Sequence, residues 1–243
     1  MYKFRLRFSK TGSLRFIGHL DFLRIFQQMI RRAGLPIAYS KGFNPHQQLS
    51  FALPLPLGMT SINDYADITL ATGIPPLEIV KTLNVAAPQG LHIHAAKPIN
   101  QGEGAAAAIV ITAMYFIRTD NLCQEKADAS LPEGSVSTQR RASEMLYPTE
   151  QRGLELSPII IEEILSSPTL VVLKKTKSGV KNTDIRPDIK KIVATSTGVE
   201  LLLSAGSSQF LNPLLVAEVI FGKKPCTSTI TRVELYRADG MPL

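Results

Sequence analysis

The first residues of the chain alternate between apolar and polar side chains. Residues 2–9 are YKFRLRFS, so an aromatic or aliphatic residue occupies every second position, with Lys3, Arg5 and Arg7 between them. Because successive side chains of a strand point to opposite faces, this pattern predicts a half-buried β-strand with one cationic face. We expect the apolar face of this strand to be formed by Tyr2, Phe4, Leu6 and Phe8.

Residues 19–33 follow a different period, with apolar side chains at every third or fourth position. That spacing predicts an amphipathic helix, which ends where Gly34 is followed by Leu35-Pro36. We expect the apolar side of this helix to pack against the first strand. It consists of Phe22, Ile25, Phe26, Met29, Ile30 and Ala33.

Four more elements complete the first hundred residues. A short strand is predicted at 48–53, a longer one at 63–71, a helix from Pro75-Pro76 to residue 86, and a strand at 91–95. The resulting order, β-α-β-β-α-β, is that of a ferredoxin-like unit with two split βαβ motifs on one antiparallel sheet. We assign this unit to residues 1–99.

The rest of the chain repeats this order after a linker at 100–106. Residues 119–156 are polar and without a period, apart from a helical stretch at 137–146, and form a long excursion. We therefore predict an α+β protein with two tandem ferredoxin-like halves, residues 1–99 and 107–243, each with its own antiparallel sheet. The elements expected in the second half are a strand at 109–117, a helix at 157–165, strands at 169–175, 189–195 and 199–204, a helix at 212–221 and a strand at 230–237.

The composition is that of a folded protein and removes several functional classes. Of the 243 residues, 44% are hydrophobic and 19% are charged. Cys123 and Cys226 are too few for a four-cysteine zinc site or a three-cysteine radical iron–sulfur cluster, and they fit a reducing cytoplasm. No apolar run approaches about 18 residues, and the first residues have no signal-peptide core. We expect a cytoplasmic protein with no membrane partner, no metal and no cofactor.

The positive charge is concentrated near the N-terminus. Residues 1–50 hold nine Lys or Arg residues and one acid, Asp21, whereas the whole chain has a net charge of +7. Such clustering is typical of a protein that binds a polyanion such as nucleic acid. The alternative is a basic, solvated surface that serves solubility.

The loop at 39–46, with the sequence YSKGFNPH, combines aromatic side chains with a cation, an amide and an imidazole. Aromatics interleaved with cations suit stacking on unpaired bases. The alternative is a turn whose Phe43 is buried in the core. We predict a nucleic-acid-binding surface on the first half of the chain, formed by Arg15, His19, Arg24, Arg31, Arg32, Lys41, Phe43, Asn44 and His46.

The histidines are the other candidates for chemistry. His19 begins the first helix, where it is placed either to transfer protons or to contact phosphate, and Asp21 suits the helix dipole. We expect His19 and His46 to meet on one concave surface with Arg15. His92 and His94 share one face of a strand, which is either a metal pair or a polar, solvent-facing surface. Sequence motifs of nucleotide hydrolases, serine esterases, zinc proteases and dinucleotide-binding enzymes are missing.

Several segments of the first half resemble one known family. They are RFIGHLD at 15–21, RRAGLP at 31–36, YSKGFNPH at 39–46, LSFA at 49–52 and PLPLG at 54–58, and DIRP at 184–187 follows in the second half. On these segments the chain resembles the bacterial radical-SAM-associated (radical-SAM-linked) proteins, a domain of unknown function. Gly18 and Gln47-Gln48 depart from the Ser and the Pro-Lys pair of that family, and the second departure removes a cation beside His46.

The resemblance implies a partner, because domains of this family occur alone or fused behind a cobalamin-binding radical-SAM enzyme. We therefore favour a non-catalytic accessory module that binds RNA, either tRNA or rRNA, and acts with a separate radical-SAM enzyme. A metal-independent RNA-processing or RNA-modifying enzyme that uses His19 or His46 as acid/base is the second hypothesis. A protein–protein adaptor with a basic surface is the third.

Overall fold

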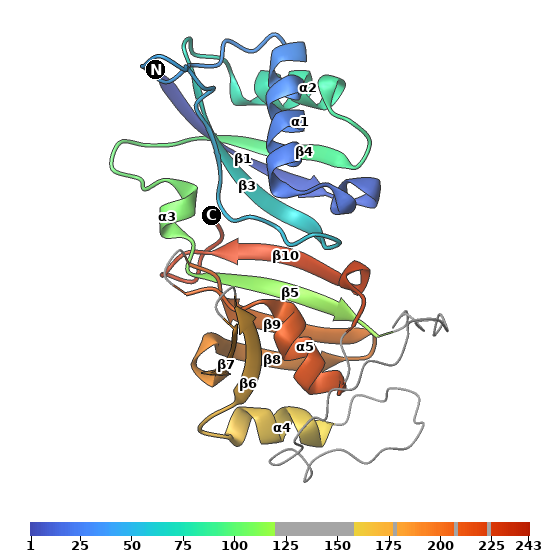
Figure 1. The fold of residues 1–243 in the computed structure, drawn as a ribbon. Coiled ribbons are helices and arrows are strands. Elements are labelled where there is room, and N and C mark those ends of the chain that lie inside the picture. The colour runs from blue at the N-terminus through green and yellow to red at the C-terminus, as the bar shows by residue number, and fades with distance from the viewer. Residues whose placement is uncertain (120–157, 177–178, 207–208, 223–224) are drawn as a thin grey trace.

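The computed structural model describes residues 1–119, 158–176, 179–206, 209–222 and 225–243. These residues form an α+β protein with a mixed eight-stranded sheet and five α-helices (Figure 1). The helix expected at 137–146 and the start of the helix expected at 157 lie outside the described residues. No helix in the described part of the chain is long and apolar enough to cross a membrane.

The first half of the chain builds one end of the sheet. Its strands are neighbours in the order β4-β1-β3-β2, and all of these pairs are antiparallel. The predicted elements are present, with strand ends shifted by up to three residues and β2 shorter than expected. They are β1 (Tyr2–Lys10), α1 (His19–Arg32), β2 (Leu49–Phe51), β3 (Thr60–Leu70), α2 (Pro76–Ala86) and β4 (Leu91–Pro98).

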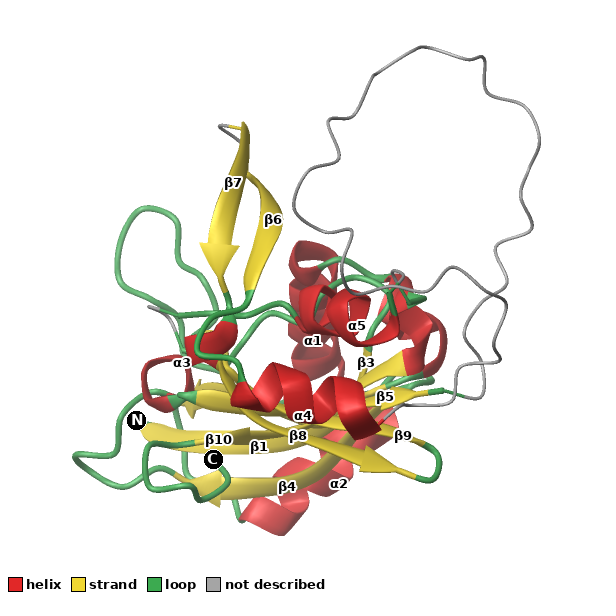
Figure 2. Cartoon of the chain, turned by 90° about the horizontal axis from the view of Figure 1, so that it is seen from below, coloured by secondary structure: helices red, strands yellow, loops and turns green. Residues whose placement is uncertain are grey.

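The second half contributes the order β10-β5-β9-β8 to the same sheet. Strands β6 and β7 form a separate antiparallel hairpin that projects from the body of the molecule (Figure 2). The sequence predicted only the first strand of this hairpin. The elements are α3 (Ala106–Ile109), β5 (Thr112–Arg118), α4 (Pro158–Ser166), β6 (Val171–Thr176), β7 (Gly179–Asp184), β8 (Ile189–Thr195), β9 (Gly198–Ser204), α5 (Pro213–Phe221) and β10 (Ile230–Tyr236).

The core of the first half confirms the predicted packing of α1 on β1. Apolar side chains of both elements are buried in one cluster, in which the Phe8 ring lies 5.4 Å from the Phe26 ring. Tyr2 is the exception, since it is 53% exposed and contributes nothing to this cluster. It lies at the end of β1, beyond the reach of α1. The buried members from the two elements are Phe4, Leu6, Phe8, Phe22, Phe26, Met29 and Ile30.

The expectation of two separate antiparallel sheets is wrong, because β10 pairs with β3 in parallel. The pairing is short and joins Thr231 to Thr60 and Arg232 to Ser61. Strand β3 has 11 residues, so β2 covers only one end of its outer edge and leaves the other end free for β10. The sheet thereby continues from one half of the chain into the other.

Candidate functional site

Two of the nine basic residues among residues 1–50 have buried side chains. Arg5 is 3% exposed and donates from Nε and Nη2 to the carboxylate of Asp67, at 2.8 and 3.1 Å, while its Nη1 lies 2.9 Å from Glu103 Oε1. Lys10 is equally buried and donates from Nζ to the carbonyl oxygen of Ile17 at 2.9 Å. These cations hold the structure together, so part of the clustered charge has no role in binding a partner.

Helix α1 carries exposed cations on the side that faces away from the sheet. Arg24 and Arg31 are both exposed, and their spacing of two helical turns places them on a common face. Arg24 Nη1 lies 2.7 Å from the Asp21 carboxylate, so Asp21 orients a cation. Arg32 points toward α2 instead, where Nη2 donates to the carbonyl oxygen of Ala86 at 2.9 Å.

The start of α1 presents a second group of candidates. Arg15 stacks its guanidinium 4.8 Å from the centre of the Phe16 ring, which is 60% exposed. His19 is exposed and packs edge-on against Phe51, with 5.6 Å between ring centres. It borders a cavity of about 10 Å³ that Lys10 also lines. This volume is that of roughly one water molecule, so no larger ligand fits there.

The 39–47 loop extends beyond β2 and is closed at its base by its own backbone. Tyr39 pairs with Gln47, and the Ser40 amide donates to the His46 carbonyl oxygen at 2.8 Å. The His46 amide in turn donates to Ser40 Oγ at 2.9 Å. Phe43 is fully exposed, which excludes a place for it in the core. The loop therefore displays an aromatic ring beside Lys41 and Asn44, which are both exposed.

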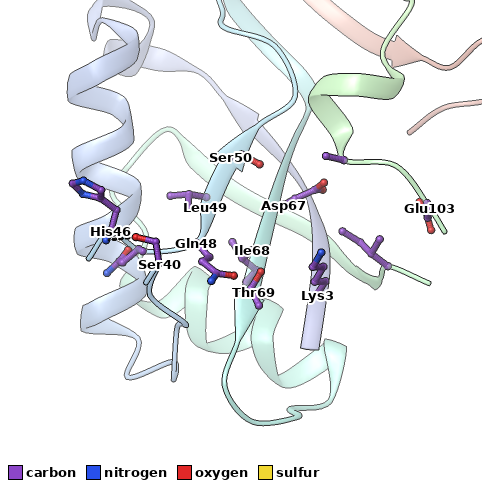
Figure 3. Close-up of a pocket in the computed structure, with 13 residues that line it drawn as sticks. Lys3, Ser40, His46, Gln48, Leu49, Ser50, Asp67, Ile68, Thr69 and Glu103 are labelled. Atoms are coloured by element: carbon purple, nitrogen blue, oxygen red, sulfur yellow. Dashed lines mark hydrogen bonds between the residues drawn. The ribbon is translucent and has the colours of Figure 1, made fainter. Parts of the chain in front are cut away.

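A cavity of about 410 Å³ lies beside the base of this loop (Figure 3). Most of its lining surface is apolar, and we name it the polar cavity for the polar side chains that enter it. Strands β1, β2 and β3 form its floor, on the side of the sheet opposite α1 and α2. One wall comes from the 39–47 loop and the other from residues 99–105, which connect β4 to α3. The side chains that give it polar character are Lys3, Ser40, His46, Gln48, Ser50, Asp67, Thr69 and Glu103.

The predicted residues occupy separate places on the first half of the chain. His19 and His46 line different cavities, so they do not form the single concave site that the sequence suggested. His19 begins α1, whereas the 39–47 loop follows its other end, and 14 residues of helix span about 20 Å. All nine predicted residues are nevertheless at the surface, with Arg15 partly buried and the other eight exposed.

Apart from His46, sequence reasoning missed the polar residues that line the polar cavity. Asp67 and Glu103 are brought to Arg5 from 62 and 98 positions away in the chain, and Ser50 pairs with Asp67 across two strands. No local pattern connects residues so far apart. The alternation of β3 marks Asp67 and Thr69 as one face of a strand, and this was the only signal available.

The pKa of Lys10, which lines the small cavity beside His19, is shifted by its surroundings. Its ammonium group lies 4.6 Å from the centre of the Phe22 ring. Burial lowers the pKa of Lys10, the carboxylate of Asp64 opposes this shift, and the guanidinium of Arg232 adds to it. The arrangement places a lysine with a reduced pKa beside His19, and such a pair suits acid–base chemistry.

His92 and His94 lie together on the exposed face of β4, with 5.1 Å between ring centres. Burial, together with the neighbouring His92, lowers the pKa of His94. Within the described ranges, no three His, Cys, Asp or Glu side chains are grouped so as to hold a metal ion. Both side chains are exposed, as in the polar, solvent-facing surface that the sequence offered as the alternative to a metal site.

Two of the segments that carry the family resemblance have structural roles. Residues 54–58 cross the junction between the halves, where the Gly58 amide donates to the Arg15 carbonyl oxygen at 2.8 Å. In the segment at 184–187, Asp184 Oδ1 accepts from the amides of Leu170 and Arg186 at 2.8 and 3.0 Å. Arg186 continues this corner by donating from Nη2 to the Leu165 carbonyl oxygen at 2.7 Å.

Comparison with known proteins places the chain in a family without supplying an activity. The model of one family, described as an uncharacterized protein conserved in bacteria (DUF2344), matches residues 3–213. A search of the curated proteins finds no relative. The match includes the 39–47 loop, the polar cavity and residues 184–187, and it ends before β10. The chain therefore belongs to the DUF2344 family of conserved bacterial proteins.

Proposed function

We propose that this protein is a non-catalytic RNA-binding module that acts with a separate radical-SAM enzyme on tRNA or rRNA. The radical-SAM partner rests on the family resemblance of the motif segments. The RNA partner rests on the surface of the first half, where exposed cations follow α1 and continue into the 39–47 loop. Unpaired RNA is recognised by such combinations of cations with aromatic rings.

The observation that carries the proposal is the exposure of Phe43. An apolar ring in full contact with water gains nothing for the folded state, and burying it against a ligand is favourable. Its neighbours in the loop are a lysine, an asparagine and a histidine, which supply a phosphate contact and hydrogen bonds to a base. A nucleobase stacked on the ring meets both requirements.

The architecture supports the same proposal by analogy. We propose that each half is a ferredoxin-like unit, since the strand orders β4-β1-β3-β2 and β10-β5-β9-β8 both follow the 4-1-3-2 order of that fold. Sheets of this topology are found in RNA-binding domains that stack bases on exposed aromatics. Function belongs to the site and not to the fold, so the loop remains the primary argument.

The test is an equilibrium titration of the protein with fluorescently labelled single-stranded RNA at several salt concentrations. We expect the logarithm of the affinity to fall linearly with the logarithm of salt, by about 0.7 per phosphate contacted. Lys41→Ala reduces that slope by about 0.7, whereas Lys191→Ala, an exposed lysine on β8, leaves it unchanged. Absence of RNA binding at low salt overturns the proposal.

The aromatic contribution is tested separately with Phe43→Ala. Loss of one stacked base costs about 1–3 kcal/mol, which weakens RNA binding about 5- to 150-fold. Phe210→Ala is the matched control, because Phe210 is a partly exposed phenylalanine of the second half. Equal effects of the two variants contradict a specific role for the loop.

A second candidate is a metal-independent RNA-processing or RNA-modifying enzyme with His19 as acid/base. The contact of His19 with a cavity shared by the buried Lys10 favours it. RNA turnover by the protein alone, abolished by His19→Ala with RNA affinity retained, establishes this function in place of the first. Binding that is independent of salt, or limited to protein partners, establishes the adaptor hypothesis instead.

A further inference from the structure

The polar cavity on the open face of the sheet has walls that are fixed without a ligand. Residues 99–105 are tied down by the Ile99 amide, which donates to the Lys3 carbonyl oxygen at 2.9 Å. They are also held by Arg5, which donates to the Gly104 carbonyl oxygen at 2.8 Å and bridges Asp67 to Glu103. The Ala106 amide completes this wall by donating to Asp67 Oδ2 at 2.7 Å.

The opposite wall is held by the base of the 39–47 loop. The Gln48 amide donates to the Ala38 carbonyl oxygen at 2.8 Å, and its side-chain nitrogen donates to the Tyr39 carbonyl oxygen at 3.2 Å. The Thr69 amide of β3 donates to the Gln48 carbonyl oxygen at 3.0 Å. The cavity between these walls is therefore preorganised, and its 410 Å³ is within the range of small-molecule sites.

Several polar groups in the cavity have no partner among the described residues. The hydroxyls of Ser50 and Thr69 make no side-chain hydrogen bond within the described part of the chain, although Thr69 is only 7% exposed. Gln47 also lines the cavity, but its side-chain oxygen is buried and is not open to a ligand there. The two hydroxyls can each donate and accept, so a ligand that supplies their partners gains these hydrogen bonds.

The charges around the cavity indicate which ligand it takes. The carboxylates of Asp67 and Glu103 are paired with Arg5, and Lys3 adds one exposed cation. Arg5 alone pairs with the two acids, which leaves one net negative charge in the interior, so the interior favours a neutral ligand that has hydrogen-bond donors. Lys3 remains available for a single negative group at the rim.

We propose that this cavity binds one nucleotide, with the base in the cavity and the phosphate at Lys3. The base supplies N–H groups and ring acceptors for the hydroxyls of Ser50 and Thr69. A nucleotide unit of this chemistry comes either from an RNA strand or from the free nucleotide pool. We assign it to the RNA strand, because Ser40 and His46 line the cavity at the base of the loop that displays Phe43. In this form the inference rests on the proposed function.

The experiment measures two affinities in parallel, for the four free nucleoside monophosphates by NMR titration and for labelled single-stranded RNA by anisotropy. Ser50→Phe fills the cavity from the exposed edge strand and Thr69→Val removes one hydroxyl at constant shape. We expect Ser50→Phe to weaken both ligands at least about tenfold and Thr69→Val about three- to tenfold. Thr112→Val, on β5 and outside the cavity, is the control and leaves both affinities unchanged.

The outcomes separate the two proposals. If RNA binds and Phe43→Ala weakens it, but neither cavity variant affects either ligand, the nucleotide site is overturned and the RNA-binding function stands. If monophosphates bind and Ser50→Phe blocks them while RNA does not bind, the cavity is a site for free nucleotides and the RNA-binding function fails. If neither ligand binds, both proposals fail.

Discussion

Residues 39–46 and 54–58 are both among the segments that carry the family resemblance, but their surroundings in the structure differ. The 54–58 segment is bound to both halves of the sheet. Arg232 donates to the carbonyl oxygens of Leu53 and Pro54, and Leu55 packs against the core of the second half. The 39–47 loop is closed mainly by its own backbone and leaves Phe43 and Lys41 in solvent. The contacts of the 54–58 segment contribute to stability, whereas Phe43 and Lys41 of the loop make no such contribution and remain exposed.

The basic side chains of the molecule divide in the same way, into buried ones with fixed partners and exposed ones. Arg232 is fully buried and bonded to Asp64, with Nε and Oδ1 2.8 Å apart, so its charge holds β10 to β3. Arg24 and its partner Asp21 are 72% and 64% exposed. A count of basic residues in the sequence does not distinguish buried, paired cations from exposed ones. Burial and partners decide which of them remain available to a polyanion.

The largest effect is expected at the buried ion pair between Arg232 and Asp64. Arg232→Met leaves the carboxylate of Asp64 buried without its partner, which destabilises the protein by about 3–5 kcal/mol in denaturant unfolding. The double variant with Asp64→Leu removes both charges and recovers most of that loss. A loss below about 1 kcal/mol in the single variant shows that the ion pair does not hold the junction together.

A glycine in each segment provides the second test. Gly58 has φ of +87°, and a Cβ there lies 2.0 Å from Thr227 Oγ1, so Gly58→Ala destabilises the protein by about 2–3 kcal/mol. Gly42 also has a positive φ, of +135°, but nothing lies within 4 Å of an added Cβ. Gly42→Ala therefore adds backbone strain without a clash and costs about 1–2 kcal/mol, less than Gly58→Ala. Thermal unfolding of both variants measures the difference, and equal values refute it.

Glu234 gives a pH-dependent test of the junction. Burial raises the pKa of Glu234, while hydrogen bonds from the Tyr65 hydroxyl and the Leu235 amide oppose the shift. A carboxyl whose folded pKa is raised stabilises the protein below its unfolded pKa of 4.5, and this stability is lost as the pH rises through the folded pKa. Glu234→Gln removes this dependence, so its stability relative to the parent protein increases with pH over that interval. A difference that is constant with pH contradicts the assignment.

The smallest stability effect is expected at the exposed pair on α1. Arg24→Ala breaks an exposed ion pair at i,i+3 and changes the free energy of unfolding by no more than about 0.5 kcal/mol. The same variant reduces the salt dependence of RNA binding by about 0.7 in slope, because one phosphate contact is lost. Unchanged RNA binding by Arg24→Ala removes the outer face of α1 from the proposed interface.

Much of the fold followed from local patterns. The alternation of residues 2–9 and the helical period of residues 19–33 predicted β1, α1 and the core between them, because burial of one face imposes a period on the sequence itself. The exposed loop was predicted from the glycine, proline and polar residues at 39–46. These patterns did not decide whether Phe43 is buried in the core or exposed to solvent, because a single loop residue belongs to no periodic pattern.

Only the tertiary structure decided the sheet junction, the polar cavity and the role of each cation. Arg5 meets Asp67 across 62 residues, and Arg232 meets Asp64 across 168. The spacing of hydrophobic residues shows which face of its own helix or strand a side chain occupies. These contacts depend instead on how strands from distant parts of the chain pair with one another. The sequence by itself therefore determined the helices and strands and where along the chain the basic residues lie. The long-range pairing of strands determined which basic side chains are buried in ion pairs and which remain exposed.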